Sequence, residues 1–229
     1  MKFINSKLKY SNQIVLSTAM VYFHKFLILK EQLVNELIFE EKLLLSSSLI
    51  FLSCKATNRL ISINSILPIV KEILIKKKKN LNKYEDNEYI KERIFDFECE
   101  ILSSLDFDLN VDLPYKFLPK LKKYFDENVQ LNSKKLVELC CYYINDTFIL
   151  PLSLFYIPDA IAISCVSLLS HKFNFEVNFD KLILESEFPI HKEEITHLEI
   201  LISKIYEKNK EKKEDNSSTM DEESVKICL

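Results

Sequence analysis

The side chains with the most chemical potential in this sequence are its six cysteines and four histidines. Thiols and imidazoles act as nucleophiles, acid–base groups or metal ligands when they occur at characteristic spacings. The chain has no Cys-x-x-Cys pair, no His-Glu-x-x-His motif and no cysteine at zinc-finger distance from a histidine. The adjacent residues Cys140 and Cys141 lie in an apolar helical pattern, where thiols are normally inert. The pattern therefore predicts no catalytic residue, no metal and no cofactor, and thiols buried in a reducing compartment.

Glycine is absent from the whole sequence of 229 residues. Phosphate-binding loops, dinucleotide-binding turns, nucleophile elbows and the glycine-rich loop of kinases need glycine at fixed positions, because the backbone there takes positive φ or approaches a ligand closely. Two-residue hairpins also lose their preferred turn residue. The absence of glycine argues against nucleotide-dependent enzymes and against an antiparallel sheet protein.

The charged residues nearly balance, with 31 lysines and arginines against 34 aspartates and glutamates. The net charge of −3 gives no strong field for nucleic acid or for an anionic membrane. No stretch reaches the roughly 18 to 20 consecutive apolar residues that span a bilayer, and the first 30 residues do not read as a secretion signal. We expect an intracellular protein with no membrane and no direct nucleic-acid partner, and a core that needs no disulfide bonds.

Apolar residues recur at three- and four-residue intervals through most of the chain, which predicts helices. The predicted helices are residues 13–29, 40–56, 62–79, 88–105, 114–126, 132–149, 158–173, 178–185 and 190–207. Residues 40–56 are apolar or small on almost every side, as in a helix surrounded by other helices. Residues 106–114 alternate like a strand, but no second strand is nearby, so we expect an extended linker. Residues 80–87 are predicted to form a polar loop, and residues 208–229 a disordered charged tail.

An internal repeat divides the chain in two. Ile50–Lys55, at the end of one apolar helix, are echoed by Ser167–Lys172, at the end of another. The repeat predicts an all-α protein of two successive five-helix bundles, each wrapped around one buried helix. The predicted domains are residues 1–110 and 111–207, followed by the tail, and the first helix of the first bundle is reduced to about residues 2–8.

Several segments carry a recognisable pattern, in one order and at plausible spacing. They are Thr18–Phe26, Phe51–Lys55, Glu98–Leu109, Ile144–Thr147 and Tyr156–Ala162. Together they resemble the cyclins, in particular the transcription-associated branch with cyclins C, H, K, L and T, over most of residues 3–207. The resemblance implies a cyclin-like fold with two cyclin boxes. It also implies a non-catalytic regulatory subunit that binds and activates a cyclin-dependent Ser/Thr protein kinase.

The resemblance implies which residues bind the kinase. Lys55, at the end of the central helix, and Glu98, in the fifth helix, form the polar centre of the contact, and Leu102, Phe107 and Leu109 flank them. A lysine ammonium that leaves an apolar helix can hydrogen-bond partner backbone, while a nearby carboxylate fixes its rotamer. Without the resemblance, Lys55 is interpreted as a lysine that snorkels at a helix end, and Glu98 as a solvated carboxylate.

The same resemblance implies a nuclear protein, with a cytoplasmic pool left open, whose kinase acts in RNA polymerase II transcription or RNA processing, and a kinase of the cell-division cycle is the second choice. Further transcription-complex subunits are expected partners. Two alternatives use the same helices without a kinase: a general transcription factor of the TFIIB type and a helical adaptor. The first needs a basic stripe for DNA, which this slightly acidic chain does not predict.

The sequence departs from the family near the expected site. Ala56-Thr57-Asn58 follow Lys55 where the family usually has an acidic pair, so the charge pattern facing the kinase differs and the choice of kinase is open. The substrate-docking patch that some cyclins carry on the first helix has no counterpart, so either the chain begins late or it lacks that route. Lys76–Lys79 are predicted to be a solvated helix end rather than a phosphate contact.

Overall fold

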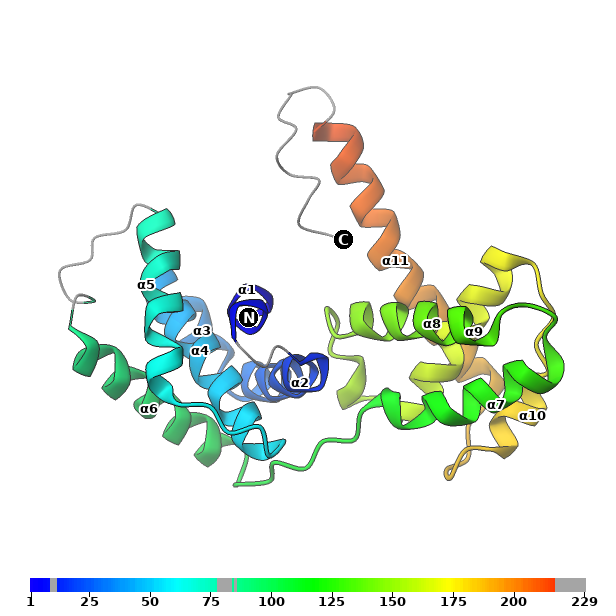
Figure 1. Ribbon diagram of the computed structural model, residues 1–229, viewed down its shortest axis with the longest axis horizontal. Coiled ribbons are helices and arrows are strands. Elements are labelled where there is room, and N and C mark those ends of the chain that lie inside the picture. The colour runs from blue at the N-terminus through cyan, green and yellow to red at the C-terminus, as the bar shows by residue number, and fades with distance from the viewer. Residues whose placement is uncertain (9–11, 78–83, 85, 217–229) are drawn as a thin grey trace. The chain divides into compact units, whose positions relative to one another are not determined.

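The computed structural model describes residues 1–8, 12–77, 84 and 86–216, and within these residues every regular element is helical (Figure 1). The predicted all-α class is therefore confirmed. The chain separates into two compact units. The first consists of Met1–Leu113 together with Leu150–Tyr156, and the second of Pro114–Ile149 together with the chain from Ile157 onward.

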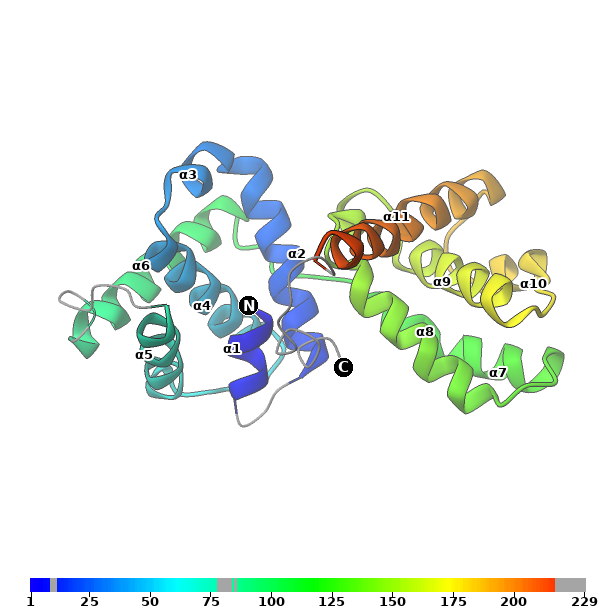
Figure 2. The ribbon, with the colours of Figure 1, turned by 90° about the horizontal axis from the view of Figure 1, so that it is seen from above.

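The first unit is built around α4 (Phe39–Ala56). The helices in contact with α4 are α1 (Lys2–Lys7), α2 (Gln13–Leu29), α5 (Leu67–Lys76) and α6 (Asn87–Ser104). Figure 2 shows α4 enclosed between α2, α5 and α6. Every residue from Leu43 to Cys54 except Ser46 is buried, so α4 meets neighbours on all its sides. The central helix predicted from its apolar circumference is confirmed.

The starts of α2 and α6 follow from side chains that cap them. Asn12 accepts a hydrogen bond from the backbone N–H of Ile14 at 2.7 Å, and Asp86 accepts one from the N–H of Glu88 at 2.9 Å. Each cap satisfies an N–H that has no partner inside its helix. The capping residues therefore fix where these two helices begin.

The helix predicted to be capped by Ser62 begins instead at Leu67, and Ser62 caps the short 3₁₀ turn η1 (Ile63–Ser65) by accepting the N–H of Asn64. Pro68 gives the physical reason, because a proline lacks the N–H that a helix needs beyond its first turn. At the first or second position of α5 the missing donor costs little. The same helix ends at Lys76, before the predicted end at residue 79, and the predicted polar loop lies largely outside the described residues.

Some helix ends use positive φ, although the chain has no glycine to adopt it. The described residues with positive φ are Asn58, Asp106, Phe107 and Asn174, at 54°, 49°, 58° and 51°. They follow α4, α6 and α9, at positions where glycine is usual. After α6, the N–H of Phe107 donates to the carbonyl of Leu102 at 3.0 Å and closes the helix end. Asparagine and aspartate tolerate this conformation, whereas phenylalanine is an outlier in it.

The second unit is built around α9 (Pro158–Phe173), in which every residue from Ala160 to Ser167 is buried. The elements in contact with α9 are the 3₁₀ turn η2 (Pro114–Phe117), α8 (Ser133–Thr147), α10 (Phe179–Leu184) and α11 (Lys192–Asn216), and α7 (Leu118–Asn128) packs on α8. The repeat seen in the sequence thus relates two buried helices, α4 and α9.

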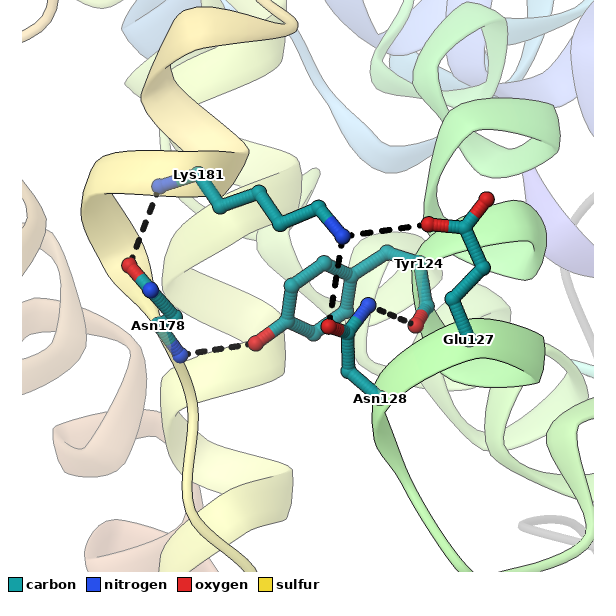
Figure 3. A network of polar contacts seen from close by, with 5 residues as sticks. All are labelled: Tyr124, Glu127, Asn128, Asn178 and Lys181. Carbon is teal, nitrogen blue, oxygen red and sulfur yellow. Dashed lines mark hydrogen bonds and ion pairs between the residues drawn. The ribbon is translucent and has the colours of Figure 1, made fainter.

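A closed polar network fastens α10 to α7 in the second unit (Figure 3). The Oη of Tyr124 accepts the backbone N–H of Asn178 at 2.7 Å, and the Asn178 side chain caps α10 by accepting the N–H of Lys181 at 3.1 Å. The Nζ of Lys181 then donates to Glu127 at 3.1 Å and to Asn128 at 3.2 Å. Asn128 donates back to the carbonyl of Tyr124 at 2.7 Å. The network holds a helix too short to be stable alone.

Two elements differ from the sequence prediction. The short helix α3 (Glu31–Glu36), which was not predicted, follows α2 after a single intervening residue, Lys30. The last helix, α11, continues to Asn216 instead of ending near residue 207, so the predicted disordered tail is wrong for residues 208–216. Lysine and glutamate are good helix formers, so a charged composition does not by itself end a helix. The rest of the predicted tail, residues 217–229, lies outside the described residues.

Candidate functional site on α4 and α6

Lys55 and Glu98 meet where α4 packs against α6. The Nζ of Lys55 donates to Oε1 of Glu98 at 2.7 Å and to Oε2 at 2.9 Å. Lys55 lies in the last turn of α4, and Glu98 lies within α6. The exposed fraction is 42% for the Lys55 side chain and 8% for that of Glu98. The structure thus brings the two predicted polar residues together, one at the surface and the other beneath it.

Because Glu98 is buried, its pairing with Lys55 also restricts the conformations of both side chains. A carboxylate taken out of water is costly unless it is paired and hydrogen-bonded. Both of its oxygens are satisfied by the Lys55 ammonium, so the two side chains hold each other in one geometry. A half-exposed ammonium fixed in this way is organised to bind an acceptor on another protein, because less side-chain entropy is lost on binding.

The apolar residues predicted to flank this pair differ in exposure. Leu102 lies one turn after Glu98 on the same face of α6 and is partly buried against the core, as is Leu109. Phe107 exposes 72% of its surface. Of these three residues, Phe107 therefore offers most of the apolar area that remains to be covered.

The loop that carries Phe107 and Leu109 is tied to α2. The buried Tyr22 donates its hydroxyl hydrogen to the carbonyl of Leu109 at 2.7 Å. Burial, and then the charge of Asp108, raise the pKa of Tyr22 to about 12. The neutral hydroxyl therefore persists at physiological pH and keeps the loop in place.

Two aromatic residues at this site were missed in the sequence. The Phe51 ring lies with its centroid 4.2 Å from the Lys55 ammonium, and its centroid is 6.1 Å from that of Phe95. Phe51 precedes Lys55 by one turn of α4, and Phe95 precedes Glu98 by one turn of α6, so helical spacing could have identified both. Because α4 is apolar on almost every side, the sequence pattern indicated only a core position for Phe51.

Among the described residues, no group of His, Cys, Asp and Glu side chains is placed to hold a metal ion. Burial raises the pKa of the Cys54 thiol to about 11 and also raises the pKa values of Cys140 and Cys165, which disfavours reactive thiolates. Cys99 is exposed, contrary to the prediction of buried thiols, because it lies on the outer face of α6.

Within the part of the chain that the structure describes, no helix is both long and apolar enough to cross a bilayer.

Comparison with known proteins finds a family model that matches part of the first unit. Residues 4–110 match the family model described as cyclin, N-terminal domain. Human Cyclin-K is 34% identical to this chain over 89 residues, which are 38% of this chain and 15% of Cyclin-K. The chain therefore spans only a small part of that relative.

A solved structure resembles a larger part of the fold. A chain in the structure of the CAK complex from Chaetomium thermophilum, bound to ATP-gamma-S, aligns with a TM-score of 0.55 over 84% of this chain and 56% of that one. The two sequences are 16% identical, so the match concerns the fold alone. The cyclin-like fold expected from the sequence is confirmed.

Proposed function

We propose that the chain, which matches the cyclin N-terminal domain over residues 4–110 and resembles human Cyclin-K, binds and activates a cyclin-dependent protein kinase. The proposed contact is the face formed by α4, α6 and the loop after α6. Its residues are Lys55, Glu98, Leu102, Phe107 and Leu109. The chain supplies binding energy to this contact and takes no part in the phosphoryl transfer.

The proposed activation is a population shift. A protein kinase is active when a glutamate on its mobile helix reaches the lysine that binds the ATP phosphates. A regulator that binds only the conformation with this pair in place raises the fraction of active kinase by its difference in affinity for the two states. The rigid Lys55–Glu98 pair and the exposed Phe107 ring provide such a selective surface.

The likeness to human Cyclin-K and to a chain of the CAK complex supports the transcription-associated assignment. In this proposal the kinase acts in RNA polymerase II transcription or RNA processing, and the chain works in the nucleus with further subunits of a transcription complex. The net charge of −3 supports binding to protein rather than directly to DNA.

The observation that carries the proposal is a buried Glu98 paired with a half-exposed Lys55 inside a cyclin N-terminal domain. The test is affinity purification of the full chain, identification of the kinases that co-purify, and an activity assay with the recombinant pair. The wild-type chain is expected to retain a cyclin-dependent kinase and to raise its activity. The double variant Lys55→Glu with Glu98→Lys keeps opposite charges at the two positions but inverts those that face the kinase.

The double variant is expected to weaken kinase binding by about 2 kcal/mol or more, because a charge of the wrong sign then faces the partner. Lys123→Glu in α7, an exposed position, is the matched control and should bind normally. Circular dichroism and thermal unfolding check that both variants fold. Unchanged kinase binding by the double variant rejects the site. No co-purifying kinase rejects the function, and a bound but unactivated kinase favours an adaptor.

A further inference from the structure

The Lys55 ammonium is contacted on two sides. Its hydrogen bonds to the two oxygens of Glu98 are 2.7 and 2.9 Å long, and the Phe51 ring centroid lies 4.2 Å away. A cation within about 6 Å of an aromatic ring is attracted by the negative face of the ring. Since a lysine ammonium has three N–H donors, Glu98 leaves at least one N–H for an outside acceptor.

Phe51 is itself supported by Phe95. Their ring centroids are 6.1 Å apart with the planes tilted by 55°, a geometry typical of attractive aromatic pairs. Phe51 is 6% exposed, whereas Phe95 is 41% exposed. The order from core to solvent is therefore Phe51, then Phe95, with the ammonium beside the inner ring.

We infer that Phe51 is a positioning residue for Lys55 and that Phe95 holds the Phe51 ring in place. The contact with Glu98 fixes the distance of the Lys55 ammonium from α6. Without a second contact, the long lysine side chain could still reach Glu98 in several conformations. The Phe51 ring removes part of this freedom. The free N–H is then directed before any partner arrives, and its consequence for kinase binding rests on the proposed function.

A core role alone gives Phe51 no preference for an aromatic ring. Leu49, Ile50 and Leu52 are buried beside Phe51 in α4, so aliphatic side chains also fill the core at this level of the helix. The contacts of Phe51 with the Lys55 ammonium and with the Phe95 ring both depend on the charge distribution of the ring, but only the first is lost when Lys55 is replaced by methionine. This difference separates a positioning role from simple packing.

The first experiment needs no kinase. In the full chain, NMR should show the ε-methylene protons of Lys55 shifted upfield by the Phe51 ring, relative to those of the exposed Lys42. Phe51→Leu is expected to remove the shift, and Phe95→Leu to reduce it. A Lys55 resonance at the position of Lys42 in the folded wild-type chain overturns the inference, whatever the protein binds.

The second experiment measures the consequence with the recombinant kinase identified by co-purification. Phe51→Leu is expected to weaken binding about fivefold, and to have no further effect in a Lys55→Met background. Pentafluorophenylalanine at position 51 keeps the ring shape but reverses the charge of its face, and should weaken binding as leucine does. Phe95→Leu is the second variant, because Phe95 is more exposed than Phe51 and its replacement is less damaging to the fold. It should also weaken binding, but by less than Phe51→Leu.

The outcomes separate the two proposals. If Phe51→Leu weakens binding equally in the wild-type chain and in the Lys55→Met background, Phe51 acts by packing and the inference fails while the proposed function stands. If Lys55→Met binds the kinase as tightly as wild type, the proposed site fails, and the NMR result still decides whether Phe51 positions Lys55.

Discussion

Phe107 combines an unfavourable backbone conformation with an exposed aromatic ring. Its φ of 58° costs a residue with a side chain about 1–2 kcal/mol, and 72% of its surface faces solvent. The conformation lets the Phe107 N–H close the end of α6, but glycine would adopt it without this cost, and the exposed ring buries little surface in the isolated chain. Such conformations usually persist where they serve binding or catalysis, and here the ring lies in the proposed contact with the kinase.

Phe107→Gly should therefore make the chain more stable but a weaker kinase binder. The free energy of unfolding is expected to rise by about 0.5–1 kcal/mol, because relief of the backbone cost exceeds the added chain entropy of glycine. Denaturant unfolding measures the first effect and a kinase-binding assay the second. Asp106→Gly, with a native φ of 49°, is the matched control and should leave binding intact. A less stable Phe107→Gly would mean that the ring packs onto its own unit.

Tyr22 gives the chain a dependence on alkaline pH. Its pKa is about 12 in the folded protein against an ordinary value of 10.0, so folding favours the neutral hydroxyl. This contribution is complete below pH 10 and is lost as the pH rises from 10 to 12. Tyr22→Phe should therefore show a smaller loss of stability over that range. Thermal unfolding at several pH values checks this, and identical slopes for both proteins would contradict it.

At the scale of the helix, α10 depends on the network that joins it to α7. Tyr124 is 4% exposed, and its Oη accepts the backbone N–H of Asn178. Tyr124→Phe removes that acceptor and should lower the free energy of unfolding by about 1–3 kcal/mol. Hydrogen exchange of the Asn178 amide should increase at the same time.

Lys181→Ala is the matched control for this network. It removes the exposed ion pair with Glu127 but leaves the Tyr124 acceptor in place, so it should cost less than about 1 kcal/mol. Equal effects of the two variants would show that the surface contacts, and not the buried hydroxyl, hold α10.

Most helices could be predicted because the spacing of their apolar residues indicates which face of the helix is buried. The centre of α4 and the start of α9 at Pro158 follow from local chemistry, and α6 begins one residue before its predicted start. Where α11 ends could not be predicted, because favourable helix formers and a disordered composition look alike in a charged sequence. The short helix α3 has too few residues to show a period.

At the scale of the whole molecule, a short segment from the second half of the chain belongs to the first unit. Leu150–Tyr156 group with Met1–Leu113, and the turn η3 (Leu152–Leu154) packs against α2. Leu152 is 5% exposed. The first unit is therefore not continuous in sequence.

Leu152→Ala should accordingly destabilise the first unit. The expected cost is about 2–5 kcal/mol, the range for truncating a buried leucine, with faster hydrogen exchange in α2. Leu182→Ala in α10 is the matched control, fully buried, and should affect amides of the second unit instead. Faster exchange in α8 and α9 but not in α2 after Leu152→Ala would contradict the grouping of η3 with the first unit.

The sequence by itself determined the helical class, the buried central helices and the family resemblance, because helical periodicity, caps and motifs are local in the chain. Only the tertiary structure decided that Glu98 is buried, that Lys55 reaches both of its oxygens and that Phe51 lies beside the ammonium. These facts depend on how α4 and α6 approach each other, and no local pattern encodes the distance between two helices. The tertiary structure likewise decided that Phe107 stays exposed, because the burial of a side chain depends on which parts of the fold cover it.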